Sequence, residues 1–444
     1  MSTNLTWIGE KARNEPDLVF TSLYHHVTDV DNLSRRWRDY EALDDDKAVG
    51  VDGVTREEYG KGLEENLQDL SNRLKRMGYK PKPKRRTYVP KPGSAKGRPL
   101  GISCFGDKVV ELAVKRVLEP IYEEAFEDSS YGYRPNRSPH ECVDKLGRTI
   151  QQKRVSHIVE ADIKGYFDNV NHEWMLKFVQ HRIGDPRIIR LISRMLKGGI
   201  LEDGLVKASE KGTPQGSILS PLLSNIYLHY VLDIWFSRRI KRQCRGETYY
   251  FRFADDFLAC FQYKADANAF RRRLGDRLEG FSLELAPEKT RCIEFGRFAR
   301  ENARRHGQKP EEFTFLGFTY YCGKTKRGYF KVKRRTCRKK YGRSMQEFTN
   351  WARRGRSVLR KAEMLRRAKS RVIGHLSYYA ITDNSEKCTS YLYHVTRILF
   401  KWLNRKSQRK TYTWEGYRQA LLWVGWPKPN VRKDLNPFRS LQAI

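Results

Sequence analysis

The fold is decided by a stretch that reads Tyr249-Tyr250-Phe251-Arg252-Phe253-Ala254-Asp255-Asp256-Phe257-Leu258-Ala259-Cys260-Phe261. Residues 249–253 and 257–261 are short apolar runs rich in aromatic side chains, a pattern typical of buried β-strands. The pattern therefore predicts two strands joined at an acidic turn that contains Asp255 and Asp256. Neighbouring carboxylates repel each other, and burial adds a desolvation cost. A bound divalent cation would remove both costs.

A second acidic position, Asp162, follows another apolar run. Residues 156–161 read Ser156-His157-Ile158-Val159-Glu160-Ala161 and predict a strand that ends at Asp162. Taken singly, Asp162 is explained as a cap and Asp255-Asp256 as an ordinary hairpin turn. If the two sites converge, they predict a pair of divalent ions about 3.5–4 Å apart that catalyses in-line phosphoryl transfer. Mg²⁺ suits such a site because it binds through one or two carboxylates plus substrate phosphates.

The rest of the chain separates into regions of different character. Residues 1 to about 75 have helical periodicity, whereas Pro81 and Pro83 predict an extended segment over residues 80–86. Residues 107–126 return to helical periodicity. From about residue 155 to 320, short apolar strands alternate with helices and turns, which predicts an α+β domain with an antiparallel sheet.

The composition changes near residue 325, where we expect a domain boundary. Residues 324–343 contain eleven Lys or Arg and no acidic residue. Residues 351–405 are basic, helical in periodicity and interspersed with aromatic residues. A short segment rich in tryptophan follows from about residue 410 and ends in a proline-bearing tail.

The charge of the chain indicates a polyanionic partner. There are 87 Lys and Arg against 52 Asp and Glu, a formal net charge of +35, and aromatic residues make up 12%. Basic residues interleaved with aromatic ones suit phosphate contacts beside base stacking, so nucleic acid is favoured over an acidic membrane or mere solubility. The sequence has no apolar run long enough to span a membrane and no signal peptide. Its eight cysteines include no C-x-x-C pair, so we expect reduced thiols and a cytoplasmic protein.

Seven blocks of the sequence occur in an order that resembles the reverse transcriptases encoded by bacterial group II introns, also called maturases. The resemblance covers about residues 50–420. The blocks are Arg86-Thr87-Tyr88-Val89-Pro90-Lys91-Pro92 with Lys96-Gly97-Arg98-Pro99-Leu100-Gly101-Ile102; Ser130-Tyr131-Gly132-Tyr133-Arg134-Pro135-Asn136-Arg137-Ser138 with His140; Asp162-Ile163-Lys164 to Phe167-Asp168 with His172; Gly212-Thr213-Pro214-Gln215-Gly216-Ser217-Ile218-Leu219-Ser220-Pro221 with Asn225; Phe253-Ala254-Asp255-Asp256; Leu285-Ala286-Pro287-Glu288-Lys289-Thr290; and Phe315-Leu316-Gly317-Phe318. His375-Leu376-Ser377-Tyr378-Tyr379 and Lys401-Trp402-Leu403-Asn404-Arg405 resemble the family's maturase, or thumb, domain.

The resemblance implies a right-hand polymerase whose fingers and palm contain the antiparallel sheet and whose thumb is all-helical. We expect an N-terminal extension (1–78), reverse transcriptase fingers and palm (79–325), a thumb or maturase domain (326–409) and a short C-terminal DNA-contacting segment (410–444). The chain departs from the family where Phe253 replaces a tyrosine and Ser217 replaces a glycine. The latter is tolerable unless that backbone needs a positive φ. The paired cysteines and histidines of the family's endonuclease domain are absent, so second-strand DNA cleavage is not expected.

The resemblance also implies roles for individual residues. Asp162, Asp255 and Asp256, with the Ile163 carbonyl, would ligate two Mg²⁺ ions, with Mn²⁺ as an alternative, and Lys289 would assist the leaving pyrophosphate. The remaining residues fall into two groups by expected partner. The deoxynucleotide would contact Lys91, Arg98, Ile163, Gln215 and Phe167, the last as a steric gate against a ribose 2′-hydroxyl. The nucleic acid strands would contact Arg134, Arg137 and Asn225.

The function implied is RNA-directed DNA synthesis on an RNA template and primer from dNTPs. The protein would also bind a structured group II intron RNA, assist its splicing and copy it at a target DNA. Two alternatives stay open. One is a non-catalytic RNA-binding splicing factor, and the other is a domesticated relative that serves DNA repair or phage defence. The sequence does not reveal the oligomeric state.

Overall fold

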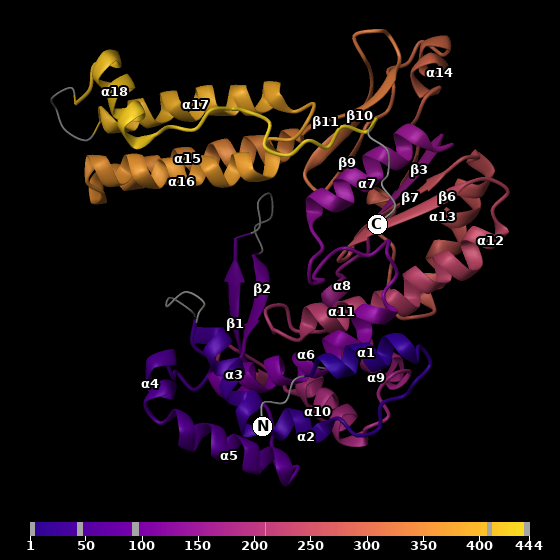
Figure 1. Ribbon diagram of the computed structural model, residues 1–444, viewed down its shortest axis with the longest axis vertical. Coiled ribbons are helices and arrows are strands. Elements are labelled where there is room, and N and C mark those ends of the chain that lie inside the picture. The colour runs from indigo at the N-terminus through magenta and orange to yellow at the C-terminus, as the bar shows by residue number, and fades with distance from the viewer. Residues whose placement is uncertain (1–4, 42–47, 91–96, 209, 406–410, 439–444) are drawn as a thin grey trace.

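A computed structural model describes residues 5–41, 48–90, 97–208, 210–405 and 411–438 (Figure 1). Among these residues, no helix has the length and the apolar composition that crossing a bilayer requires. The α-helices of the N-terminal half are α1 (Thr6–Asn14), α2 (Tyr24–Thr28), α3 (Val30–Glu41), α4 (Arg56–Lys61), α5 (Leu63–Lys75), α6 (Phe105–Ala125), α7 (Pro139–Gln152), α8 (Tyr166–Asn169), α9 (His172–Gln180) and α10 (Pro186–Lys197). Those of the C-terminal half are α11 (Ser220–Leu228), α12 (Lys241–Gln243), α13 (Lys264–Glu279), α14 (Ala299–Arg305), α15 (Arg338–Val358), α16 (Lys361–Tyr379), α17 (Ser385–Leu403) and α18 (Trp414–Val424).

A four-stranded antiparallel sheet, called here the central sheet, lies in the middle of the molecule. Its strand order is β6 (Thr248–Phe253), β7 (Asp256–Phe261), β3 (His157–Ala161) and β8 (Arg291–Glu294). β6 and β7 form the hairpin predicted from their apolar runs, although β7 begins at Asp256 rather than at Phe257. The prediction of an α+β domain with an antiparallel sheet is confirmed.

Both faces of the central sheet are buried, which explains its almost uninterrupted apolar strands. Along β7, Phe257, Ala259 and Phe261 belong to the core shared with α6, α9, α11 and α13. Leu258 and Cys260 belong to a second core that includes α7 and a three-stranded sheet. That sheet has the order β11 (Phe330–Thr336), β10 (Phe318–Lys324) and β9 (Phe313–Phe315). β7 is therefore held from two sides at once.

The N-terminal helices pack around α6 and share its core. The helix predicted over residues 107–126 is α6, and the segment predicted to be extended leads into β1 (Lys84–Val89). β1 pairs with β2 (Arg98–Ile102) and with β4 (Ile200–Glu202), and β5 (Leu205–Lys207) completes the sheet. Figure 1 shows the β1–β2 hairpin rising from the N-terminal helices toward α15 and α16. The N-terminal region and the central sheet thus form one continuous body.

The predicted boundary near residue 325 falls within the β10–β11 hairpin. All seven residues of β10 pair with β11, from Phe318 opposite Thr336 to Lys324 opposite Phe330. The all-helical part therefore begins at Arg338 rather than at residue 326. The basic composition of this stretch is compatible with a strand because the side chains alternate in burial along β11.

The C-terminal residues are not separate from the helical part, contrary to the division predicted at residue 410. Tyr417 of α18 is fully buried in the core of α15, α16 and α17 and donates a hydrogen bond to the Thr396 carbonyl at 2.9 Å. The chain then runs back to the central body. There Lys433 and Ile381 form an isolated β-bridge, and the Leu435 carbonyl accepts a hydrogen bond from Arg334. We call α15–α18 the helical body.

Candidate active site

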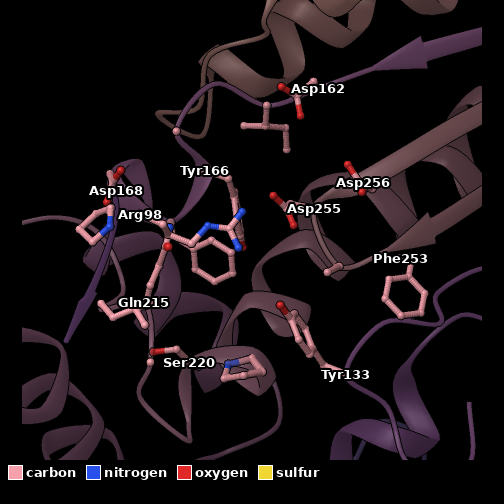
Figure 2. A pocket seen from close by; sticks show the side chains of 18 of the residues that line it. Arg98, Tyr133, Asp162, Tyr166, Asp168, Gln215, Ser220, Phe253, Asp255 and Asp256 are labelled. Carbon is pink, nitrogen blue, oxygen red and sulfur yellow. The ribbon is translucent and has the colours of Figure 1, made fainter. Parts of the chain in front are cut away.

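The three aspartates of the two acidic segments lie on the wall of one cavity of about 1060 Å³. The register of the central sheet brings them there. Ala161, the last residue of β3, is opposite Phe257, so Asp162 emerges beside Asp256 at the same end of the sheet. Figure 2 shows Asp162, Asp255 and Asp256 gathered on one side of this cavity. Segments almost a hundred residues apart therefore present carboxylates to a common space.

The turn that carries Asp255 is tight and strained. Phe253 pairs with Asp256, which leaves Ala254 and Asp255 as the two turn residues. Ala254 has φ +58°, in the left-handed region that costs an alanine about 1 kcal/mol. Gly132 packs against this turn so closely that a Cβ atom would lie 2.2 Å from the Ala254 nitrogen. Strain of this kind persists only where surrounding contacts hold it.

A buried polar network supplies those contacts, and its centre is Arg252. The Arg252 side chain is 0% exposed and binds both carboxylate oxygens of Asp233, which is also 0% exposed, at 2.8 and 2.5 Å. Its Nη1 donates to Asn225 Oδ1 at 2.9 Å and to the Ala254 carbonyl at 3.1 Å. Asn225 in turn donates to the Gly132 carbonyl at 2.7 Å. The network therefore connects the strained turn to α11 and to the Gly132 loop.

The electrostatics of the cavity disfavour negative charge on the aspartates. Burial, followed by the charge of Asp162, raises the pKa of Asp255. Burial and then the neighbouring Asp255 and Asp162 charges raise the pKa of Asp256 to about 6. Asp256 as a whole residue is exposed to solvent. Its carboxyl nevertheless lines a concave cavity, where protein atoms replace part of its hydration shell. Both shifts indicate a site short of positive charge.

Lys289 partly compensates for that shortage. It is the last residue of the 3₁₀-turn Pro287–Lys289, and its Nζ lies 2.5 Å from Asp162 Oδ2. The hydrogen bond to Asp162 is the main cause that raises the pKa of the lysine, so it stays protonated. The side chain is 62% exposed and therefore free to exchange this partner for another anion. Its predicted role at the leaving group stays a prediction.

The donor set fits a hard divalent cation that is completed by substrate. Within the described residues, no three His, Cys, Asp or Glu side chains form a ready-made metal cage. The cavity instead offers carboxylate oxygens from Asp162, Asp255 and Asp256, and Ile163 also lines it. Mg²⁺ commonly takes such incomplete protein ligation and fills the rest of its shell with phosphate oxygens and water. Burial and neighbouring negative charges raise the pKa values of the two turn carboxylates, and a bound cation would offset both effects.

Four of the residues predicted to contact the nucleotide line the same cavity: Arg98, Ile163, Phe167 and Gln215. Arg98 is exposed at the start of β2, and its charge acts on the Asp255 carboxyl. Figure 2 shows Arg98 reaching from the β1–β2 side toward Asp255. Lys91 lies outside the described residues, so its predicted role stays untested.

Glycines hold the loop of Gln215 and the turn of Phe167 close to their neighbours. Gly216 has φ +104°, and a Cβ there would come within 3.0 Å of the Gly101 carbonyl oxygen. The Gln215 carbonyl accepts from Gly101 N at 2.6 Å, which joins the loop to β2. Ser217 does not have a positive φ, so its replacement of glycine causes no backbone strain. The Phe167 carbonyl accepts from Thr213 N at 2.8 Å, so the same loop positions Phe167.

The structure gives no support to the predicted nucleic-acid contacts of Arg134 and Asn225, which stay predictions. Arg134 is buried and binds Glu123 and the carbonyls of Glu127 and Ser130. Asn225 is 1% exposed and belongs to the Arg252 network. Arg137 is committed to Asp128 and Glu141, both at 2.7 Å, which leaves the predicted strand contact without support. These residues position the loop of Gly132 instead.

Several cavity residues were not singled out by sequence reasoning. Tyr133 is 50% exposed, lies in the left-handed region at φ +59° and lines the cavity near Asp255. Lys340, Tyr378 and Tyr379 reach the cavity from the helical body, and the Lys340 charge acts on Asp256. A tyrosine between glycine and arginine in the second block was the available signal for Tyr133. The contribution of the helical body had no local signal.

Comparison with known proteins agrees with this geometry. Residues 89–320 match the reverse transcriptase (RNA-dependent DNA polymerase) family, and the chain belongs to that family. It is 39% identical over 222 residues to the group II intron-encoded protein LtrA of Lactococcus lactis subsp. cremoris, a match that covers 50% of this chain and 36% of LtrA. It is 34% identical over 316 residues to protein YkfC of Escherichia coli (strain K12), covering 64% of this chain and 82% of YkfC. A shorter match, 30% over 95 residues, relates it to nuclear intron maturase 1 of Arabidopsis thaliana and covers 21% of this chain and 13% of the maturase.

The burial of the Arg252–Asp233 pair gives a stability prediction. Arg252→Met leaves Asp233 charged, buried and unpaired, which costs about 3–5 kcal/mol of unfolding free energy. Arg13 provides a matched control because it also binds one carboxylate, that of Glu124, through two nitrogens, but its side chain is 67% exposed. Arg13→Met should cost far less, because an ion pair exposed to solvent contributes little to stability. Urea unfolding of the two variants measures both values, and equal losses would contradict the role given to the network.

The raised pKa of Asp256 gives a pH-dependent prediction. A carboxyl whose pKa is about 6 in the folded protein and near 3.8 when unfolded destabilises the fold above about pH 6 and has no effect below about pH 4. Asp256→Asn should therefore raise the unfolding temperature at pH 7.5 in EDTA, and the gain should vanish as the pH falls to 4. Asp17→Asn, at an exposed aspartate, is the control. A gain that is independent of pH would refute the electrostatic interpretation.

Proposed function

We propose that this protein is an RNA-directed DNA polymerase that binds group II intron RNA, assists its splicing and reverse-transcribes it for mobility. The observation that carries the proposal is the convergence of Asp162, Asp255 and Asp256 on one cavity in a chain of the reverse transcriptase family. Carboxylates at this density are costly unless cations and phosphates complete the site. The match to LtrA, whose name states that it is encoded by a group II intron, supports the intron-related part.

The arrangement of the molecule supports assignment as a right hand. The central sheet would be the palm, the N-terminal body with the β1–β2 hairpin would form the fingers, and the helical body would be the thumb. Cavity residues come from all three: Arg98 from the hairpin, the aspartates from the sheet, and Lys340 from the helical body. A template, a primer end and a nucleotide would meet where the three parts meet.

The aspartates and the Ile163 carbonyl would hold two Mg²⁺ ions, with Mn²⁺ as an alternative. Bound metal would make the primer 3′-hydroxyl more acidic and stabilise charge on the transferred phosphate. The protein's own part is to hold the turn that carries Asp255 and Asp256 in place through the Arg252 network, so little reorganisation is needed there on binding. Lys289, kept protonated beside Asp162, can transfer its contact to the departing pyrophosphate.

The nucleotide would lie between the aspartates and the β1–β2 hairpin. Arg98 offers a planar set of donors to the triphosphate. Lys91, which lies outside the described residues, would add a second cation. Phe167 packs edge-on against the buried Tyr166, with ring centroids 5.2 Å apart, and is thereby kept in one place. A fixed ring on the cavity wall would exclude the 2′-hydroxyl of a ribonucleotide, and Gln215 would contact the sugar.

The basic residues of the helical body support binding of nucleic acid duplexes. We infer that α15 and α16 face the product duplex and that other surfaces of this body contact intron RNA and target DNA. RNA duplexes are recognised chiefly by shape and backbone contacts, which suits arginine and lysine on helices. A purely RNA-binding splicing factor would not need the cost of Asp255 and Asp256, so the catalytic function is favoured.

Asp255→Asn tests the catalytic proposal. Loss of one metal ligand removes several kcal/mol of charge stabilisation, so primer extension on an RNA template should fall by about 10³-fold. Asp203→Asn removes the same charge from the β4–β5 turn and should leave extension unchanged. Wild-type extension should also stop when EDTA is added and resume with excess Mg²⁺. A wild-type protein that extends no primer under any of these conditions would favour the splicing-factor alternative.

Phe167→Ala tests the steric gate. Removing the ring opens space at the sugar, so discrimination against ribonucleotides should fall on the order of 10–100-fold. The measurement is the ratio of kcat/KM for dCTP and CTP on one template. Phe167→Tyr, which keeps the ring, should retain the wild-type ratio. Full discrimination by the alanine variant would show that another residue selects the sugar.

A further inference from the structure

A second pocket, of about 500 Å³, lies away from the active site and is lined by three arginines, a tryptophan and an isoleucine: Ile234, Trp235, Arg238, Arg239 and Arg277. It shares no lining residue with the catalytic cavity. Its walls come from the segment between α11 and α12 and from α13. Figure 1 shows α12 and α13 at the edge of the molecule remote from the helical body. We call it the arginine pocket.

One continuous helical segment connects the two cavities. It consists of α11, a π-helical turn η1 (His229–Asp233), Ile234 and Trp235, a second π-helical turn η2 (Phe236–Ile240) and α12. Ser220, its first residue, lines the catalytic cavity, and Arg238 lines the arginine pocket. Eighteen residues of helix separate them by about 25 Å, since each adds at most about 1.5 Å. π-Helical turns are rare and occur frequently at functional sites.

The π-helical turn η1 prepares one wall of the arginine pocket. Its wider winding leaves carbonyls that accept from Arg277, whose Nε donates to Val231 at 2.9 Å and whose Nη2 donates to Tyr230 at 3.0 Å. The Arg277 guanidinium also lies over the Phe281 ring, 4.4 Å from its centroid, and faces Trp235 at 5.8 Å. The guanidinium is therefore held in one orientation with a nitrogen, Nη1, left for another acceptor.

Arg238 and Arg239 have no acidic partner within the part of the chain that the structure describes. Both are exposed, and no acidic residue lines the pocket. Burial and then the Arg239 charge lower the pKa of Arg277, so these two cations repel one another. Unpaired like charges around a fixed guanidinium are costly without a bound anion. Elsewhere many arginines of this chain bind carboxylates, as Arg137 and Arg148 do.

We propose that the arginine pocket binds the phosphate backbone of a structured RNA, at a site separate from the template–primer channel. Arginine donates to phosphate oxygens in a planar, multi-donor arrangement, and Trp235 offers a stacking surface beside it. RNA is favoured as the polyanion because this chain belongs to a family that acts on RNA. The site shares no lining residue with the catalytic cavity, so it would anchor an RNA while another strand is copied.

The proposal rests on the proposed function only for the identity of the polyanion. Its test therefore uses a ligand that cannot be extended: a closed RNA hairpin with blunt ends, with binding measured by fluorescence anisotropy in EDTA over a series of KCl concentrations. Arg238→Ala/Arg239→Ala should weaken binding about tenfold at 100 mM KCl. The slope of log K against log [KCl] should shrink by roughly 2, since two phosphate contacts are lost.

Two further variants control the test. Arg300→Ala/Arg304→Ala removes the same charge from exposed positions on α14 and should change neither affinity nor slope. Arg238→Lys/Arg239→Lys keeps the charge but not the planar donor set, so the salt slope should stay near that of wild type while affinity falls. No variant should unfold at a lower temperature than wild type, because neither Arg238 nor Arg239 contributes to a core.

Primer extension on a short RNA template separates this proposal from the polymerase function. The Arg238→Ala/Arg239→Ala variant should extend the primer as fast as wild type. The proposal is overturned if hairpin binding by this variant equals that of the α14 control, or if polyglutamate displaces the hairpin from wild type as effectively as unlabelled RNA. If wild type binds the hairpin through these arginines but extends no primer, the polymerase proposal fails and the arginine pocket stands.

Discussion

One buried guanidinium holds the turn that carries Asp255, and the rest of the candidate site depends on it. Arg252 is sealed from solvent, yet its ionic and hydrogen-bonding partners come from η1, α11 and the turn itself. A charge in this position is tolerable only because the Asp233 carboxylate and neutral acceptors satisfy its donors. These hydrogen bonds hold Ala254 in its strained conformation and keep Gly132 packed against the turn. They thereby place Asp255 in the cavity. These buried polar groups together fix the turn formed by Ala254 and Asp255.

The candidate active site has an imbalance of charge. Three carboxylates lie on one wall, and their mutual repulsion adds to the cost of ionising Asp255 and Asp256. Three cations, Lys289, Arg98 and Lys340, approach from separate parts of the fold. The protein cations only partly offset the acids, and each of them is mobile or exposed enough to exchange partners. Divalent ions and a triphosphate would restore the balance. The arginine pocket, at the other end of the same helical segment, has the opposite imbalance: three arginines and no acidic residue line it.

Local patterns predicted the parts of this structure that depend on local physics. The strands around Asp255 and Asp256, the strand before Asp162 and helix α6 all appear where apolar runs and periodicity placed them. Acidic residues at strand ends were recognisable because acids there are unusual. Arg134 and Asn225 show a limit of such patterns, because an arginine or asparagine in a loop motif looks the same whether it binds a strand or a neighbouring carbonyl. The boundary at 325 was misplaced because composition changes before the sheet ends, and no local signal reveals pairing between β10 and β11.

The attachment of the helical body has a mechanical consequence. Its base is joined to the rest of the molecule by several contacts close together: Lys331 with Asp383, the Tyr378 hydroxyl with the Leu316 carbonyl, and the returning chain at Leu435. Its opposite end, near α18, lies away from the central sheet (Figure 1). α15 is about 30 Å long, so it acts as a lever arm. A rotation of a few degrees at the base would displace the far end by a few ångströms. The contacts at the base would therefore govern the width available to a duplex.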